Sequence, residues 1–281
     1  MIPAYLYQYT TMDSVLAILE NKTIRFTRLD SLNDLNEGCC GEYAHLKKYV
    51  YISSWSADER ESIPMWSLYG RDKMGKILDQ GVRIKVPTNL FTFDENGGLT
   101  EELTLKKVLN NWNVVTEVKT KDIDLGEDIK EKLADVDFNA DFFKRKEVFG
   151  PVKVDYTPFA DYVGRYSTPL KPIQLPGLYS FDPKGIGYEK VDDWAYENEY
   201  RFWMRYPYCN GISGSGDVLK NDLSFTKVPY IDVFYNEKAI PEMELQLAPN
   251  FNINLVKTFE SELKKRGFTK ELRKSALDVR I

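Results

Sequence analysis

The stretch YLYQYTTMDSVLAILENKTIRFTRL, residues 5–29, carries the pattern that decides the fold. Residues 4–9 alternate between apolar and polar positions, which predicts a strand. Thr10 or Thr11 can cap the helix that follows, because apolar residues recur at helical spacing from Met12 to Leu19. Alternation returns in Ile24–Leu29. The chain therefore opens with a strand, a helix and a second strand, joined by short connections.

Outward from this unit, the same patterns predict further elements and one different region. Residues 88–150 are charge-rich and helical in pattern, and they predict a helical insertion. Residues 151–190 are rich in proline, which indicates irregular strands and loops. We therefore expect one α+β domain over residues 1–281, with a mixed or antiparallel sheet core and flanking helices. The other predicted elements are strands at Tyr49–Trp55, Gly81–Val86, Tyr196–Tyr206 and Pro229–Tyr235, a short helix capped by Ser62, and a closing helix at Ile253–Arg266.

Composition narrows the class of protein. The 281 residues are 43% hydrophobic and 29% charged, so a sizeable core is expected and disorder is not. The net charge of −5 argues against a general nucleic-acid binder, whose surface would be basic. No apolar run approaches the roughly 20 residues of a transmembrane helix. The first residues lack the pattern of a signal peptide. These features predict a cytoplasmic protein with no membrane partner.

Cysteine and histidine usage excludes further chemistries. The three cysteines, Cys39, Cys40 and Cys209, are a poor disulfide framework, which favours a reducing compartment. His45 is the only histidine. A zinc site with several histidines is therefore excluded, and a Ser-His-Asp or Cys-His mechanism would rest on His45 alone. No metal is expected.

The most conspicuous run of charges lies within Trp194–Met204, which we interpret as one strand. Alternation would then place Glu197, Glu199 and Arg201 on one face, with aromatic residues on the core face. Two carboxylates on one face repel each other and need a cation or a ligand nearby. One interpretation is a solvated strand face on which Arg201 neutralises a glutamate. The other is a carboxylate placed to meet a developing positive charge.

Four short motifs resemble, in order, those of a large uncharacterised bacterial family. Some of its members are described as abortive-infection proteins of phage defence. The resemblance covers about residues 5–86 and 188–266 and leaves the middle unmatched. Here the motifs read Tyr7-Gln8-Tyr9-Thr10, Asn33-Asp34-Leu35-Asn36-Glu37, Trp66-Ser67-Leu68-Tyr69 with Gly81-Val82-Arg83-Ile84, and Trp194-Ala195-Tyr196-Glu197-Asn198-Glu199-Tyr200-Arg201.

The same order also resembles, remotely, the plan of ADP-ribosyltransferases. In that superfamily a second strand carries Ser-Thr-Ser or an aromatic residue, and a late strand carries Glu-x-Glu. Ser53-Ser54-Trp55-Ser56 is similar to the former and Glu197-x-Glu199 to the latter. The resemblance implies an enzyme that acts on NAD, as transferase or glycohydrolase, and a toxin-type effector of phage defence. Its acceptor would be a protein or a nucleic acid.

The resemblance also implies roles for individual residues. Glu199 would stabilise the oxocarbenium-like transition state, and Glu197 would assist the acceptor. Ser54 or Ser56 would hold Glu199, while Tyr69 or Trp55 would stack on nicotinamide. The residues implied to bind NAD are Gln8, Tyr9, Thr10, Arg25, Arg28, Trp55, Ser56, Tyr69 and Arg201.

Two positions depart from the patterns. Gln8 stands where the superfamily has Arg or His, so either Arg25 or Arg28 substitutes for it, or the NAD site is altered or absent. Leu35 stands where the bacterial family has proline.

Two functions from other classes remain open at this stage. A non-catalytic module could use the same aromatic and acidic cleft to sense a nucleotide or to hold a partner. A metal-dependent nuclease could be built on Asp34, Glu37, Glu197 and Glu199, although Asn33, Asp34 and Glu37 also fit a plain turn. The basic stretch 257–281 could contact a partner but is also typical of a solvated helix face.

Overall fold

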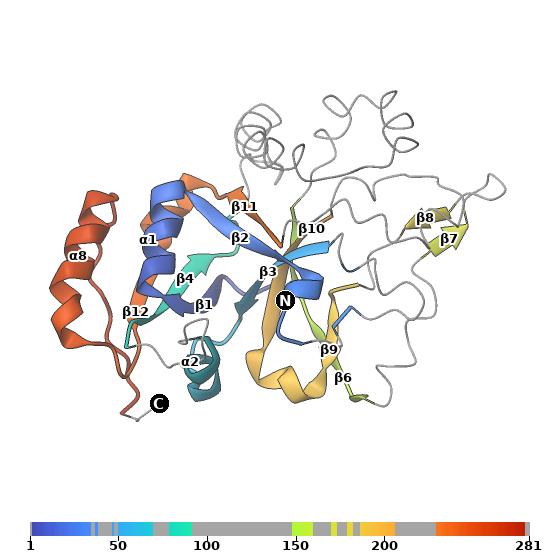
Figure 1. The fold of residues 1–281 in the computed structure, drawn as a ribbon, viewed down its shortest axis with the longest axis horizontal. Helices are drawn as coiled ribbons and strands as arrows, with labels where there is room; N and C mark the ends of the chain where they lie inside the picture. Colours follow the sequence, from blue (N-terminus) through green and yellow to red (C-terminus); the bar gives the residue numbers. More distant parts are fainter. Residues whose placement is uncertain are drawn as a thin grey trace, which may run out of the picture.

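A computed structural model describes residues 2–34, 37–38, 47, 50–69, 79–91, 148–159, 170–172, 179–181, 186–205 and 229–278. Figure 1 shows its fold. Most of the expected helical insertion, the three cysteines and His45 lie outside these ranges. No helix among the described residues is long and apolar enough to cross a membrane.

The opening strand, helix and strand form as the sequence predicts. They are β1 (Tyr5–Thr11), α1 (Met12–Asn21) and β2 (Thr23–Arg28). The Thr11 side chain caps α1, because its Oγ1 accepts a hydrogen bond from the Ser14 amide at 3.3 Å. Val15 and Leu19, on the apolar stripe of the helix, are buried. Lys22, in the left-handed conformation, ends it and turns the chain into β2.

Eight strands form one sheet in which every pairing is antiparallel. This confirms a mixed α+β protein with a largely antiparallel core. Its path runs β11-β2-β3-β1-β4-β12, with β10 paired to β3 and β5 paired to β10. The further strands are β3 (Val50–Ser56), β4 (Gly81–Pro87), β5 (Phe149–Lys153), β10 (Glu199–Arg205), β11 (Tyr230–Phe234) and β12 (Glu244–Leu247).

Strand β3 is a branch point of this sheet. On one side it pairs with β10 along its whole length. On the other side it pairs with β2 at Tyr51 and Ile52, and with β1 only at Ser56. The strands β1 and β2 therefore diverge along β3. The middle of β3, residues 53–55, has no strand partner on that side among the described residues.

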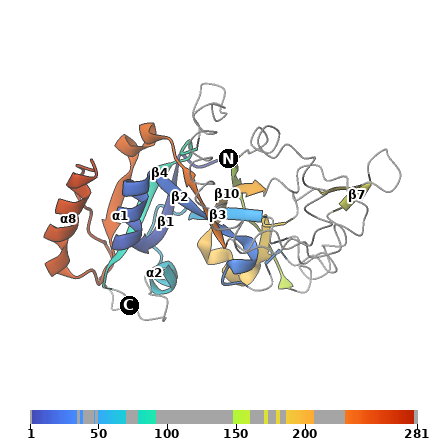
Figure 2. The same ribbon diagram turned by 45° about the horizontal axis from the view of Figure 1, so that its top comes forward.

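Helices cover the sheet, and short strands form two separate two-stranded sheets. Helix α8 (Val256–Lys265) packs on α1, and α2 (Ile63–Tyr69) contacts β1. Figures 1 and 2 both place α8 outside α1 at one end of the molecule. Smaller pairs are parallel β6 (Asp155–Thr157) with β9 (Glu189–Val191), and antiparallel β7 (Leu170–Pro172) with β8 (Tyr179–Phe181). Four 3-10 turns are η1 (Leu29–Ser31), η4 (Asp192–Glu197), η6 (Glu237–Glu242) and η7 (Ile253–Leu255).

The strand expected over Trp194–Met204, or Tyr196–Tyr206 by its apolar pattern, begins too early. Residues 192–197 form η4, and Asn198 follows in the left-handed conformation with φ of 41°. Asparagine tolerates this conformation better than most residues. Only from Glu199 does the chain run as β10. Glu197 and Glu199 therefore do not share one strand face.

Two other expectations are corrected. Of the two interpretations left open for this strand face, the solvated one is wrong, because Glu199 and Arg201 are buried, with 3% and 0% of these residues exposed. The expected insertion also ends earlier than residue 150, because β5 begins at Phe149 and pairs with β10.

Residues 272–278, here called the C-terminal strap, cover the outer edge of β12. Arg273 forms a parallel bridge to Gln246. Its amide donates to the Leu245 carbonyl, and its own carbonyl accepts from the Leu247 amide. Leu277 packs beside the buried cluster of Tyr9, Met65, Trp66 and Ala248. The strap therefore joins the edge of the sheet to helix α2.

Candidate functional site

A cavity of about 190 Å³ opens where β1 and β2 diverge from β3. It is smaller than the roughly 300 Å³ at which pockets for drug-sized ligands begin. Its walls are formed by Tyr7, Gln8, Tyr9, Arg25, Thr27, Leu32, Asn33, Glu37, Ile52, Ser53, Ser54, Trp55, Ser56, Met65, Tyr69, Lys190, Glu197, Glu199 and Arg201.

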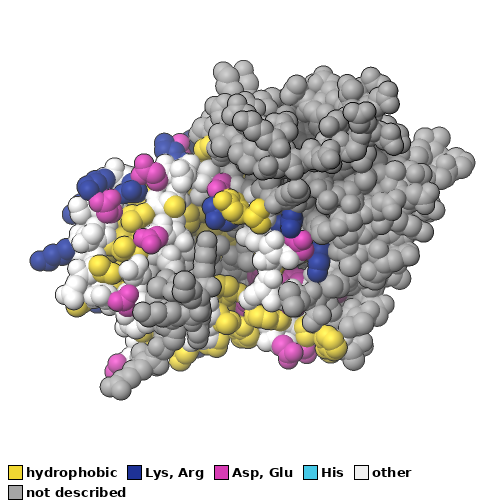
Figure 3. All heavy atoms as spheres, in the orientation of Figure 1, with side chains coloured by type: hydrophobic (Ala, Val, Ile, Leu, Met, Phe, Trp, Pro, Cys, Tyr) yellow, Lys and Arg dark blue, Asp and Glu magenta, His cyan; other side chains and the backbone are white. Residues whose placement is uncertain are grey.

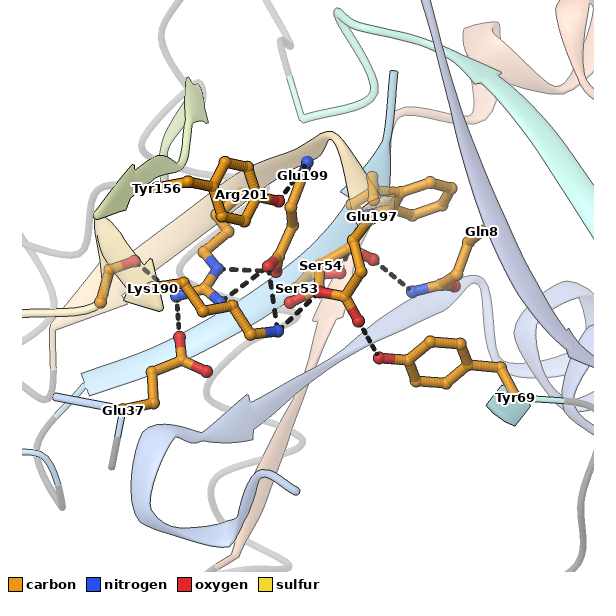
Figure 4. Close-up of polar contacts among 12 residues, drawn as sticks. Gln8, Glu37, Ser53, Ser54, Tyr69, Tyr156, Lys190, Glu197, Glu199 and Arg201 are labelled. Atoms are coloured by element: carbon orange, nitrogen blue, oxygen red, sulfur yellow. Dashed lines mark hydrogen bonds and ion pairs between the residues drawn. The ribbon is translucent and has the colours of Figure 1, made fainter. Parts of the chain in front are cut away.

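Arg201 lines this cavity and has the largest set of charged contacts among the described residues (Figure 4). Its Nε and one terminal nitrogen bind the two oxygens of Glu199 at 2.7 and 2.8 Å, the two-pronged geometry of the strongest ion pairs. The other terminal nitrogen donates to the Gly187 carbonyl at 2.7 Å and forms an ion pair with Glu37. The orientation of Glu199 is therefore fixed by the guanidinium.

Strand register adds a third contact to Glu199. Arg201 lies opposite Ser54 in the ladder, and Glu199 lies opposite Ser56, so these four side chains share one face of the sheet. The Ser54 side chain hydrogen-bonds to Glu199. Ser56 instead accepts from the Asp58 amide at 3.2 Å. Of the two serines expected to hold Glu199, Ser54 is thus the one that does so.

Glu37 reaches the cavity from the connection between β2 and β3. Gly38 follows it with φ of 67°, a left-handed conformation that favours glycine. A Cβ atom at Gly38 would also lie 2.5 Å from a methyl carbon of Leu29. The turn at Gly38 therefore requires glycine. The side chain of Glu37 is fully buried beside Arg201.

Lys190, on β9, links the carboxylates of Glu197 and Glu199. Its Nζ donates to Oε2 of Glu197 at 2.6 Å and lies 3.5 Å from Oε2 of Glu199. It also lies 4.4 Å from the ring centre of Trp194, within cation–π range. Only 3% of Lys190 is exposed. One ammonium thus connects a carboxylate on β10 to a carboxylate on the turn before it.

Tyr69 closes the opposite wall from helix α2. Its hydroxyl donates to Oε1 of Glu197 at 2.7 Å and hydrogen-bonds to the Asn33 side chain. Glu197 therefore has one oxygen on Lys190 and one on a neutral hydroxyl. A neutral partner is easier to exchange than the two charged prongs that hold Glu199.

Burial sets the electrostatics of the five charged residues. Burial alone would raise the pKa of Glu199, but Arg201 and Lys190 outweigh it and lower that pKa to about 2. Burial raises the pKa of Glu37 and of Glu197, against the opposing effects of Arg201 and Lys190 respectively. Glu199 is therefore firmly ionised, and the other two carboxyls hold a proton more readily.

The two cations keep their charges. Burial lowers the pKa of Lys190, but its three carboxylate neighbours raise it further, and the net direction is upward. The pKa of Arg201 is raised in the same way by Glu199 and Glu37. Lys190 is thus an ammonium at physiological pH, which argues against its use as a base or a nucleophile.

The structure brings together most of the residues expected at the site. One cavity is lined by Glu199, Glu197, Ser54, Gln8, Tyr9, Arg25, Trp55, Ser56, Tyr69 and Arg201. Thr10 and Arg28 are not among its lining residues. Arg28 instead pairs with Asp30 at 2.5 Å.

Three of the assembled residues make contacts that differ from their expected roles. Gln8 donates its amide to the Ser54 carbonyl at 3.1 Å, at the part of β3 left without a strand partner by the divergence. Arg25 reaches the wall but forms an ion pair with Asp232 and stacks over Tyr230. Trp55 belongs to the main hydrophobic core and donates its indole N–H to Ser53.

Sequence reasoning missed Lys190 and Tyr156. Tyr156, on β6, accepts a hydrogen bond from the Glu199 amide at 2.9 Å and so fixes the start of β10. No local pattern marks either residue. Glu37 was recognised as part of a family motif, and as part of a plain turn or of a site for a divalent cation or a ribose. Its ion pair with Arg201 gives it another role. Among the described residues no group of three or more metal-ligating side chains lies close enough to hold an ion.

Comparisons with protein-family models, with curated proteins and with solved structures find no match to this chain.

Proposed function

We propose that this protein binds the nicotinamide–ribose end of NAD in the cavity and cleaves the bond between them, as an ADP-ribosyltransferase-like enzyme. One observation carries the proposal. Glu199, Ser54, Tyr69 and Gln8, from four separate elements, line a single cavity together with two arginines. Had Glu199 pointed away from Ser54, this function would have no physical basis.

The chemistry asks for a carboxylate beside the ribose. As the bond between ribose C1′ and the pyridinium nitrogen breaks, its electron pair leaves with nicotinamide and positive charge develops on the ribose. Water or an acceptor hydroxyl then forms a bond to C1′, and its proton passes to solvent. A carboxylate held in a buried, preorganised position stabilises the developing charge more strongly than one in water.

The contacts favour Glu197 as the carboxylate that meets the ribose. Glu199 has both oxygens on the Arg201 prongs and further contacts from Lys190 and Ser54. Glu197 has one oxygen on the Tyr69 hydroxyl, which a ribose hydroxyl can replace without loss of charge pairing. Glu199 would then be the fixed anchor of the site. The resemblance instead implies that Glu199 stabilises the transition state and that Glu197 assists the acceptor.

A nucleotide-binding module without catalysis is the second candidate. It is favoured by Gln8, whose amide is used on the backbone of β3 where the superfamily has Arg or His. The geometry does not favour a metal-dependent nuclease. Arg201 and Lys190 occupy carboxylate oxygens that a divalent cation would require.

The test is incubation with NAD labelled separately in the nicotinamide and in the adenylate, alone and with cell lysate. Wild type is compared with Glu197→Gln and Glu199→Gln, and with Glu262→Gln on α8 as a control outside the cavity. We expect nicotinamide release or label transfer by wild type and by the control, with a large loss in Glu197→Gln. Saturable NAD binding without turnover would support the binding module. If the folded wild type neither binds nor turns over NAD, both the enzyme and the binding module are excluded.

A further inference from the structure

We propose that Lys190 is a positioning residue of the site: its ammonium ties Glu197 to the fixed Glu199 and keeps Glu197 a carboxylate inside the cavity. The kinetic part of this inference rests on the proposed function. The electrostatic part does not depend on it.

The geometry around Lys190 carries the first step. Glu199 is held by the Arg201 prongs on the strand β10. Glu197 precedes the left-handed Asn198 and lies on a 3-10 turn, outside the ladder that fixes β10. Lys190 contacts both carboxylates from a third element, β9. It is therefore the link through which the fixed carboxylate sets the position of the less constrained one (Figure 4).

The charges of the cluster carry the second step. Glu197 is 3% exposed and lies beside the negative charge of Glu199, and both effects favour the protonated form. Lys190 pairs with Glu197 at 2.6 Å, whereas Arg201 pairs with Glu199 and Glu37 and donates to a backbone carbonyl. Without Lys190 the pKa of Glu197 rises further, and Glu197 takes up a proton at a higher pH than in wild type.

No other described group near Glu197 replaces Lys190 in this role. Tyr69, from α2, keeps its proton because burial raises its pKa, so it contributes a neutral donor. Tyr156, from β6, has a pKa raised by burial in the same way. Glu199 adds negative charge beside Glu197, and Arg201 is paired with Glu199 and Glu37. The Lys190 side chain is also fully engaged, with two carboxylates and the Trp194 ring.

The first experiment measures the free energy of unfolding between pH 5 and pH 8 for wild type, Lys190→Met and Lys190→Arg. A buried carboxyl with a raised folded-state pKa contributes stability at low pH that is lost as the pH rises through that pKa. We therefore expect Lys190→Met to be strongly destabilised at pH 8 and to recover toward wild type at pH 5. Lys190→Arg keeps the cation and should show little pH dependence of its deficit. Lys85→Met is the matched control, because it removes a partly buried lysine on β4 that pairs with Glu244 on β12.

A Lys190→Met deficit that is the same at every pH would overturn the proposal, since a purely structural lysine gives that result. Failure of Lys190→Met to fold at pH 5 as well as at pH 8 would also overturn it. Folding at pH 5 alone would support it. None of these outcomes depends on turnover of NAD.

The second experiment uses turnover of NAD where wild type shows it. An opposite charge at this distance lowers the pKa of a carboxyl by about one to three units. We expect the acid limb of kcat/KM against pH to move upward by that amount in Lys190→Met, and to stay close to wild type in Lys190→Arg. An unmoved acid limb in an active Lys190→Met enzyme would contradict the role of Lys190 and leave the proposed function standing. Absence of turnover in wild type would contradict the proposed function alone.

Discussion

The hydroxyl of Tyr69 donates to Oε1 of Glu197 at 2.7 Å, although 128 positions separate the two residues in the sequence. Tyr69 is the last residue of α2, and Glu197 is the last residue of the turn η4. This single contact joins the helix on one wall of the cavity to the acidic turn on the other. The position of α2 therefore controls what can approach Glu197.

Replacement of Tyr69 by phenylalanine should destabilise the protein. The change leaves a buried carboxylate oxygen without a donor, which costs about 1–3 kcal/mol. Tyr5→Phe is the matched control, because the Tyr5 hydroxyl donates to Glu242 at 3.3 Å at an exposed site. Loss of this contact should cost only a few tenths of a kcal/mol. Thermal unfolding of the three proteins at pH 7 measures the difference. Equal melting temperatures would show that the Tyr69 contact contributes nothing.

Removal of the guanidinium of Arg201 should be much more costly. Arg201→Met leaves Glu199 and Glu37 buried without their main cation, and such losses cost about 3–5 kcal/mol. Arg25→Met removes a largely exposed ion pair with Asp232 and should cost no more than about 1 kcal/mol. Urea unfolding compares them. The double variant Arg201→Met with Glu199→Gln should be more stable than the sum of the two single effects predicts.

The stability of the protein should depend on Glu199 in acid. The pKa of Glu199 is lowered in the folded state to about 2 from an unfolded value near 4.3. Its contribution is therefore fully present above pH 4.3 and is lost as the pH falls through the folded value. Between pH 5 and pH 2, the urea midpoint of wild type should fall more steeply than that of Glu199→Gln. Parallel curves would mean that Glu199 is not held as an anion.

Glu61 should anchor the C-terminal strap and helix α2 together. Its carboxylate accepts from the side chains of Trp66, Gln246 and Ser275 at 3.1, 3.0 and 2.5 Å, and from the Ala276 amide at 2.7 Å. Glu61→Ala should speed amide hydrogen exchange in residues 272–278 and in α2, while β10 stays protected. Glu262→Ala, a partly exposed position on α8, is the control. Unchanged exchange in the strap would refute the anchoring role.

Local pattern was sufficient for the opening unit. The strand, helix and strand over residues 5–28 follow from apolar spacing and a threonine cap, and both signals lie within a few residues of the structure they specify. The branching of β3 has no such signal. It arises from the pairing of strands that lie far apart in the sequence, and that pairing creates the cavity.

The acidic segment shows where period-two reasoning fails. Alternation continues in the sequence through Trp194–Glu199, but Asn198 adopts a left-handed conformation and the strand starts one residue later. The charges also suggested a solvated face. Glu199 and Arg201 are buried with opposite charges beside them, Lys190 next to Glu199 and Glu37 next to Arg201. No pattern within the β10 sequence indicates these two partners. The residue types of the site were thus recognisable, and their mutual neutralisation was not.

The basic surplus near the C-terminus is partly neutralised in the same non-local way. Arg266 pairs with Glu20 on α1 as well as with Glu262, and Arg273 pairs with Glu244. Charges of both signs are interspersed at the end of the molecule where α8 lies (Figure 3). This part of the surface is more typical of a solvated face than of a nucleic-acid contact.

The diverging strands have a consequence for the order of events during folding. Gln8, Glu37 and Ser54 are synthesised early, whereas Lys190 and Arg201 leave the ribosome only after the whole of residues 92–147. Until then Glu37 has neither of its buried cations, so the polar cavity cannot close around it. Long-range contacts of this kind form slowly because a long loop must be closed first. The charged centre can therefore be completed only after β9 and β10 have been synthesised.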